Sequence, residues 1–219
     1  MNIGLAFTYQ FEDEEWIKKL LLTGLIALIP IVGQIYIFGW MMEIAERFAI
    51  SSTEKLPDID FGKFLSKGFS GYIATLVYAI PGFIVMLPGI IASMFTSSAG
   101  DDATTVIMLA MVCCVGLGAL VSIVSSLVSF PAIVEVQIKD LKSGFQVKRM
   151  FAIFKGAIGA YLLAIVILAL AVPIISSLGA IACGIGVIVT LPYSISLQGA
   201  LLGMAYREGS DSLGASESF

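Results

Sequence analysis

The chain has 219 residues, of which 58% are hydrophobic and 13% charged, and its mean hydropathy is +1.00. A soluble domain carries roughly 25% charged residues, so this composition excludes an ordinary soluble protein and predicts a polytopic helical membrane protein. The net charge of −4 is spread over the termini and loops and gives no reason to expect a nucleic-acid partner.

Uncharged stretches dominate the chain. The longest runs from Gly156 to Tyr206 without any Asp, Glu, Lys, Arg or His. About 20 apolar residues cross a bilayer as a helix, and backbone in hydrocarbon must pair its own polar groups. This stretch therefore predicts two crossings. Because the apolar runs are continuous rather than alternating, a membrane β-barrel is excluded.

The apolar runs predict an all-α transmembrane helical bundle of about five spans, forming a single integral membrane domain over residues 1–206. Residues 207–219 are rich in Gly, Ser and acidic residues, which predicts a disordered cytoplasmic tail. The predicted spans are 20–42, 71–95, 106–130, 157–178 and 184–206.

Basic residues in the short connections predict the orientation. Two connections carry all of them, whereas the connections between the second and third spans and between the fourth and fifth carry none. Both basic connections are therefore predicted to be cytoplasmic, in a multi-pass protein. The basic residues are Arg47, Lys55, Lys63 and Lys67 in the first connection, and Lys139, Lys142, Lys148, Arg149 and Lys155 in the second.

The first predicted span leaves two interpretations open. A single crossing over 20–42 would place Lys18 and Lys19 outside, against the orientation rule. Pro30 interrupts the span, and proline removes a helix hydrogen bond and clashes with the preceding turn. The segment is either a kinked crossing or a re-entrant hairpin that keeps both lysines cytoplasmic, and the hairpin would raise the count to six membrane segments.

Both basic connections contain aromatic and aliphatic residues at helical spacing, such as Phe61, Phe64 and Phe69 in the first. This pattern predicts amphipathic helices at the cytoplasmic interface, with basic side chains toward anionic headgroups. Ordinary helices packed on other loops are the alternative. The predicted headgroup contacts are Lys63, Lys67, Lys139, Lys142, Lys148 and Arg149.

Small residues mark two possible packing faces. Gly199 and Gly203 form a GxxxG motif, and the third span carries a stripe of serines. Such faces allow helices to approach closely, either within the chain or with another subunit. Gln34 and Gln198 are predicted to hydrogen-bond to neighbouring helices, because an unpaired amide in lipid is costly. The stripe consists of Ser122, Ser125, Ser126 and Ser129.

Groups for catalysis are scarce. The chain has no His, and no Asp, Glu, Lys or Arg lies inside a predicted span. General acid–base catalysis and proton relays need such groups, so we expect no enzyme, no cofactor and no metal site. Glu43 and Glu135 lie just beyond their spans and are interpreted as solvated helix-end carboxylates; pairing with loop bases is the alternative.

Several short motifs carry a family resemblance. The blocks from Trp16 to Leu21 and from Leu28 to Gly33, with Gly39-Trp40 and Leu56-Pro57, resemble the opening of domain-of-unknown-function family 4013, which comprises prokaryotic integral membrane proteins. The stretch from Phe130 to Glu135 is similar to a pattern in related bacterial and archaeal membrane families. The resemblance implies a helical bundle in the cytoplasmic (inner) membrane of a bacterium or archaeon, and it implies no catalytic residue.

Together these features favour a non-enzymatic accessory or scaffold subunit that binds membrane lipids or other membrane proteins. The alternative is a transporter or channel for a small uncharged or lipid-like solute, built on proline-containing helices. The pairs Pro81-Gly82 and Pro88-Gly89 are the most distinctive proline sites for such a pathway.

Overall fold

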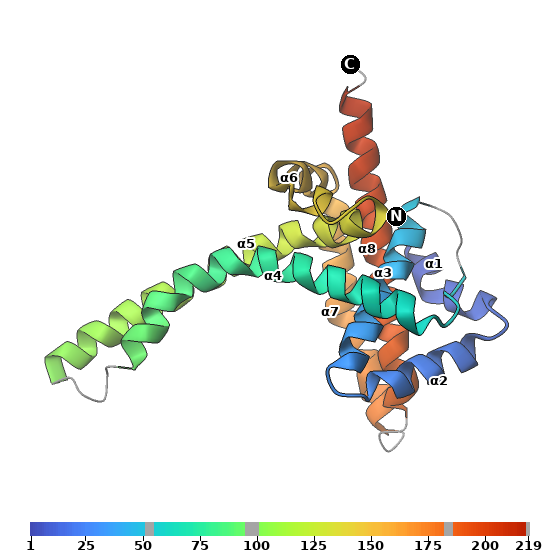
Figure 1. The fold of residues 1–219 in the computed structure, drawn as a ribbon, viewed down its shortest axis with the longest axis horizontal. Helices are drawn as coiled ribbons and strands as arrows, with labels where there is room; N and C mark the ends of the chain where they lie inside the picture. The colour runs from blue at the N-terminus through green and yellow to red at the C-terminus, as the bar shows by residue number, and fades with distance from the viewer. Residues whose placement is uncertain (51–54, 95–100, 182–185, 218–219) are drawn as a thin grey trace. The chain divides into compact units, whose positions relative to one another are not determined.

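The computed structural model describes residues 1–50, 55–94, 101–181 and 186–217, and these fold into eight α-helices with two short 3₁₀ helices (Figure 1). No strand occurs in this part of the chain, which confirms the predicted all-α fold. The α-helices are α1 (Ile3–Thr8), α2 (Trp16–Ala27), α3 (Val32–Ile50), α4 (Phe61–Ser93), α5 (Asp101–Ile138), α6 (Val147–Gly156), α7 (Ile158–Ile181) and α8 (Val187–Glu217). The 3₁₀ helices are Tyr9–Glu12 and Ser143–Phe145.

Four helices, α4, α5, α7 and α8, are long and apolar enough to cross a membrane. They contain the predicted spans 71–95, 106–130, 157–178 and 184–206, apart from residues 94, 157 and 186, which lie just beyond helix ends, and residues 95, 184 and 185, which lie outside the described residues. The helices also continue through their internal prolines. The prolines are Pro81, Pro88, Pro131, Pro173 and Pro192.

The first predicted span is not one helix. Helix α2 ends at Ala27, and α3 begins at Val32 after a turn in which Ile31 has a φ of 65°. With 12 residues, α2 is about 18 Å long, well short of the roughly 30 Å hydrocarbon core. The apolar part of α3 ends where Glu43 begins its charged turns. The two helices do not form the single kinked crossing over 20–42, and the hairpin interpretation agrees with the helices observed.

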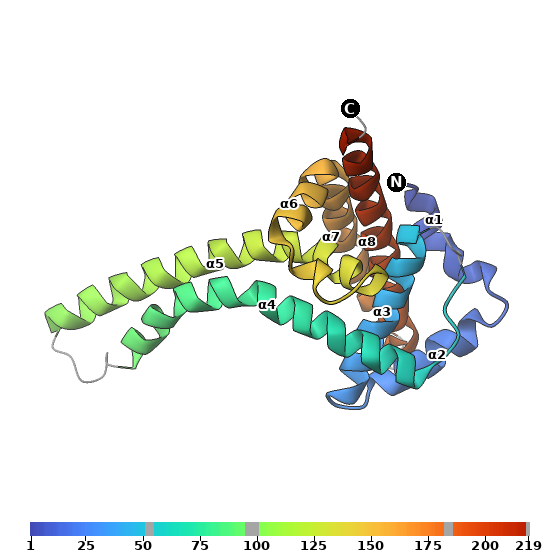
Figure 2. The ribbon, with the colours of Figure 1, turned by 45° about the horizontal axis from the view of Figure 1, so that its top comes forward.

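The chain divides into two compact units, Met1–Ala74 with Phe130–Phe219, and Thr75–Ser129. We call the first the helical core. In it, α8 packs against α3 and α7 and also contacts α2 and α6 (Figures 1 and 2). Large side chains fill the space between these helices. Those with almost no exposed surface include Tyr9, Leu20, Tyr36, Trp40, Ile44, Phe64 and Leu197.

Glycines set the close packing of α3 on α8. A Cβ at Gly199 would lie 2.7 Å from the carbonyl oxygen of Met41, and one at Gly203 would overlap with the carbonyl oxygen of Ala45. Only glycine permits this approach of two backbones, the same role that small residues have in membrane helix pairs.

The second unit, which we call the α4–α5 hairpin, consists of residues 75–93 and 101–129. Gly82 lies against Ser122, and Gly89 against Cys114. Rising numbers on one helix meet falling numbers on the other, so the two helices are antiparallel (Figure 2). Most large apolar side chains of this unit are exposed, as suits a surface that faces acyl chains.

Residues 207–217 continue α8, so the prediction of a disordered tail over 207–219 is wrong for this stretch. Residues 218 and 219 lie outside the described residues. The extension is ordered because α6 packs on it: a Cβ at Gly209 would lie 2.5 Å from the carbonyl oxygen of Ile153, and Gly156 lies against Ser212.

Candidate functional site

Glu43, near the C-terminal end of α3, forms one buried charge cluster. Its side chain is 6% exposed, and its carboxylate oxygens lie 2.8 Å from Lys63 Nζ and 2.7 Å from Lys67 Nζ. Arg47, one helical turn further along α3, places its Nε 3.1 Å away. Lys67 also pairs with Glu46. The cluster therefore ties the end of α3 to the first turns of α4.

Glu43 stays charged in this environment. Burial by itself would raise its pKa, but the bonds from Lys63, Lys67 and Arg47 outweigh the loss of solvation and lower the pKa to about 2. A carboxylate with several cationic partners tolerates burial that a lone one does not.

Glu135, near the end of α5, forms a second cluster and is fully buried. Its Oε1 lies 2.9 Å from Lys139 Nζ and 3.2 Å from Arg149 Nε. The hydroxyl of Tyr206 donates a hydrogen bond to the other carboxylate oxygen. One carboxylate thus joins α5, α6 and α8.

The two clusters share one arrangement: a buried glutamate near a helix end, a base four residues later, and further bases from the segment that follows. The prediction that Glu43 and Glu135 are solvated is therefore wrong. The structure agrees with the alternative, in which both carboxylates pair with basic residues of the connections. Gln137 connects the clusters, because its Nε2 donates to the carbonyl oxygen of Lys67 at 3.3 Å and to Ser70 Oγ at 3.1 Å.

A third ion cluster explains the path of the α2–α3 hairpin. Lys19 in α2 is buried, and its Nζ lies 2.8 Å from Asp13 and 2.7 Å from Asp58. Although burial would lower the pKa of Lys19, these bonds raise it above its usual value. Asp58 follows α3 in the chain, so the start of α2 and the segment after α3 lie on the same side of the helical core.

The predicted headgroup residues occupy two kinds of position. Lys63, Lys139 and Arg149 are held by buried carboxylates yet keep 45%, 47% and 42% of their side-chain surface exposed. Lys67 is mostly buried in its pairs. Lys142 and Lys148 are exposed and have no ion-pair partner among the described residues.

Helix α6 has the predicted amphipathic character, with one face used inside the protein. Met150, Ile153 and Phe154 are buried, as the packed-helix alternative requires. Val147 and Phe151 remain 58% and 51% exposed. The first predicted interfacial helix is instead part of α4, where Phe64 is buried, and Phe69 and Tyr72 are exposed.

The GxxxG face packs within the chain, whereas the serine stripe bonds to its own helix and Ser126 is exposed. Gly199 and Gly203 contact α3, as described above. The hydroxyls of Ser122, Ser126 and Ser129 donate to carbonyl oxygens of their own helix, and Ser125 is partly buried. Gln34 donates to the carbonyl oxygen of Ala27 across the α2–α3 turn, as predicted, whereas the amide of Gln198 has no hydrogen-bond partner among the described residues, against the prediction.

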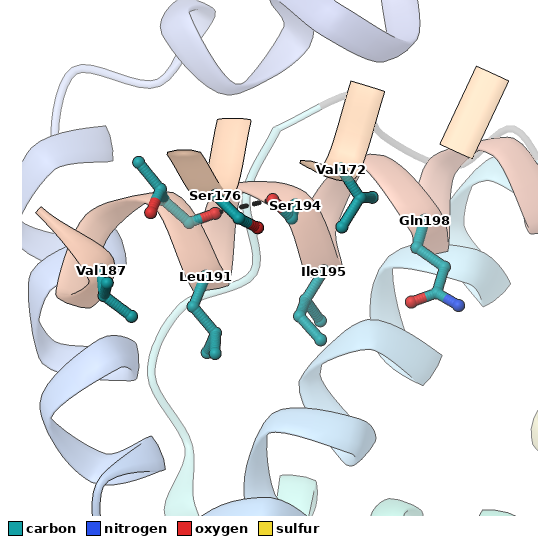
Figure 3. A pocket seen from close by; sticks show the side chains of 8 residues that line it. Val172, Ser176, Val187, Leu191, Ser194, Ile195 and Gln198 are labelled. Carbon is teal, nitrogen blue, oxygen red and sulfur yellow. Dashed lines mark hydrogen bonds between the residues drawn. The ribbon is translucent and has the colours of Figure 1, made fainter. Parts of the chain in front are cut away.

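A pocket of about 180 Å³ lies between α7 and α8. Val187, Leu191, Ile195 and Gln198 project from one side of α8 at this place (Figure 3). The other lining residues are Val172 and Ser176 from α7, and Thr190 and Ser194 from α8. The Ser194 hydroxyl donates to the carbonyl oxygen of Thr190 at 2.8 Å.

The family model described as "Protein of unknown function (DUF4013)" matches residues 22–205. The chain belongs to this family. No curated protein and no solved structure matches the chain. The matched region of this DUF4013 protein includes the pocket, Glu43 and Glu135 with their cationic partners, whereas Tyr206 and the last turns of α8 lie beyond it.

Sequence reasoning missed three contributors to this site: the Tyr206 hydroxyl, the Gln137 bridge and the polar row in the pocket. Only the polar row is visible in the sequence, because Thr190, Ser194 and Gln198 recur every four residues and so share one helix face. Within the described residues, no group of three or more Cys, Asp and Glu side chains is placed to hold a metal ion.

Proposed function

We propose that this protein is a non-enzymatic accessory or scaffold subunit of the cytoplasmic membrane, which binds anionic lipid headgroups and neighbouring membrane proteins through a basic surface. The observation that supports it is the anchoring of half-exposed cations by buried carboxylates. We define the basic surface as the exposed side chains of Lys63, Lys139, Lys142, Lys148 and Arg149.

The charge balance leaves this surface positive. Five basic residues and two acidic ones lie between Glu135 and Lys155. The buried Glu135 neutralises one charge of the two cations that contact it. A basic segment next to a membrane is attracted to anionic lipids by about 1 kcal/mol for each Lys or Arg near the surface.

Exposed apolar residues beside these cations support contact with the membrane surface. Val147 and Phe151 on α6 are more than half exposed and lie in the same segment as Lys148 and Lys155. Interfacial helices combine such apolar side chains with basic ones. The anchored cations keep their positions with little further ordering, which lowers the entropy cost of binding a headgroup.

The test uses Lys142 and Lys148, which belong to no cluster. In nanodiscs containing phosphatidylglycerol and phosphatidylcholine, the Lys142→Gln, Lys148→Gln double variant should lose about 2 kcal/mol of preference for phosphatidylglycerol, roughly 30-fold in affinity, by native mass spectrometry. Lys18→Gln, an exposed lysine outside the basic surface, is the matched control. Unchanged lipid retention in the double variant would reject the headgroup role.

The scaffold role has its own test. Purification in mild detergent should return the same membrane protein partner in independent preparations, and charge reversal at Lys142 and Lys148 should reduce its recovery. A homogeneous monomer by mass, with no reproducible partner, would count against a scaffold.

A transporter for a small uncharged solute is the second candidate, and the polar row in the α7–α8 pocket is the observation that favours it. Proteoliposome swelling in a glycerol gradient separates the two functions. Swelling that Gln198→Leu abolishes supports transport, whereas swelling no faster than that of empty liposomes rejects it.

A further inference from the structure

The pocket between α7 and α8 contains more hydrogen-bonding capacity than the protein uses. Ser194 bonds to its own helix, but no described residue bonds to the hydroxyls of Ser176 and Thr190 or to the amide of Gln198. These side chains lie in two of the four helices suited to crossing a membrane. Polar groups left without partners in hydrocarbon cost free energy.

Some other polar side chains are satisfied by backbone carbonyl oxygens, although Trp40 and Tyr161 also bury a polar atom without a partner among the described residues. Ser177, next to Ser176, donates to the carbonyl oxygen of Ile174 at 2.7 Å, the usual way in which a serine in a membrane helix is satisfied. Gln34 likewise finds a carbonyl oxygen. The groups in the pocket are therefore available to a bound molecule.

The lining defines the chemistry of that molecule. No ionisable side chain lines the pocket, so an ion would lose its solvation without a counter-charge. Val172, Val187, Leu191 and Ile195 provide apolar walls. A single water needs only about 10–15 Å³ of such space, so a volume of about 180 Å³ accepts a much larger group.

We infer that this pocket binds the hydroxyl- and ester-bearing part of an uncharged glyceride, with Thr190, Gln198 and Ser176 as hydrogen-bonding partners and the apolar walls against its carbon chain. An amide both donates and accepts, and each hydroxyl does the same, which matches a glycerol backbone carrying alcohol and ester groups. The site is independent of the basic surface and involves none of its residues.

The experiment uses the full chain in phosphatidylcholine nanodiscs, with dioleoylglycerol as the probe and bound lipid measured by native mass spectrometry and by the ligand-induced rise in melting temperature. Thr190→Val combined with Gln198→Leu keeps side-chain size and should weaken dioleoylglycerol binding at least tenfold. Ser177→Ala, one residue from Ser176 and outside the pocket, should change it less than twofold.

A second variant keeps the test valid if the double variant does not fold. Leu191→Trp retains every polar group and fills the pocket by volume, and it should also abolish the probe-induced rise in melting temperature. Binding that survives both variants would overturn the inference, as would retention of phosphatidylglycerol that these two pocket variants reduce as strongly as they reduce that of dioleoylglycerol.

Free glycerol, added in a separate series, distinguishes the source of the ligand. Protection by glycerol that the Thr190→Val, Gln198→Leu variant removes supports the same site with a soluble polyol as its occupant. Protection by dioleoylglycerol alone supports a membrane lipid. If neither probe binds the wild-type chain, the inference is wrong.

Discussion

Helices α8 and α5 are both apolar enough to cross a membrane, yet they are used in opposite ways. The most apolar part of α8 is 56% buried inside the protein, whereas that of α5 is 6% buried. Hydrophobicity does not explain the difference, because lipid is as favourable for an apolar side chain as the protein interior. The number of packing partners explains it: α8 contacts α2, α3, α6 and α7, and Gly199 and Gly203 allow α3 to approach it at backbone distance.

Charge separates the two regions as well. The helical core fixes its helix ends with buried glutamates that have several cationic partners, whereas the described part of the α4–α5 hairpin meets its surroundings mainly through exposed apolar side chains. The core should therefore respond sharply to single substitutions, and the hairpin weakly. Of the four predictions below, those on Glu135 and Gly203 test this contrast, and those on Glu43 and Ile31 test the helical core alone.

Removing the buried carboxylate of Glu135 should have the largest effect. Glu135→Ala leaves Lys139, Arg149 and the Tyr206 hydroxyl without their shared partner, and breaking a buried pair in this way costs about 3–5 kcal/mol. The measurement is the free energy of unfolding in mixed micelles. Leu120→Ala, at a residue 61% exposed in the hairpin, should cost less than about 1 kcal/mol. Equal losses would show that the hairpin is packed as tightly as the core.

Acid should weaken the core through Glu43. Its pKa is lowered from 4.5 to about 2 in the folded protein, so its contribution is complete above the unfolded pKa and is lost as the pH falls from about 5 to 2. The lost free energy is about 3 kcal/mol. Glu43→Gln should flatten the stability curve over this range, measured by unfolding at a series of pH values. Asp211→Asn, in an exposed pair with Arg207 at 3.9 Å, should leave the curve unchanged.

Adding one methyl group should lower the stability of the protein in the helical core and raise it in the α4–α5 hairpin. At Gly203 a Cβ overlaps with the carbonyl oxygen of Ala45, and at Gly116 in α5 it meets nothing within 4 Å. Gly203→Ala should therefore cost about 1–3 kcal/mol by overpacking. Gly116→Ala should stabilise its helix by up to about 1 kcal/mol. The change in melting temperature in detergent measures both effects. An equal fall in melting temperature for the two variants would refute the contrast.

The sequence predicts the long helices well, because a continuous uncharged stretch of this length satisfies its backbone hydrogen bonds in a membrane by forming a helix. It also predicts that Pro30 interrupts the first segment. It fails for Glu43 and Glu135, because a charge next to an apolar run looks the same whether it faces water or a neighbouring helix. The partners of Glu135 lie in α6, in α8 and directly after the end of α5, and that convergence depends on tertiary packing.

The smallest effect concerns the turn of the α2–α3 hairpin. Ile31 has a φ of 65°, a region in which a β-branched side chain is strained by about 1–2 kcal/mol. Its side chain is 75% exposed, so removing it gives up little packing within the chain. Ile31→Gly should therefore raise the free energy of unfolding by up to about 1 kcal/mol. Ile29→Gly, in the same turn, is the control and should lower the free energy of unfolding, because Ile29 is not among the described residues with a positive φ. If Ile31→Gly destabilises the protein as much as Ile29→Gly, the prediction is wrong. The contact of the Ile31 side chain with lipid would then stabilise the α2–α3 hairpin by more than the backbone strain at Ile31 destabilises it.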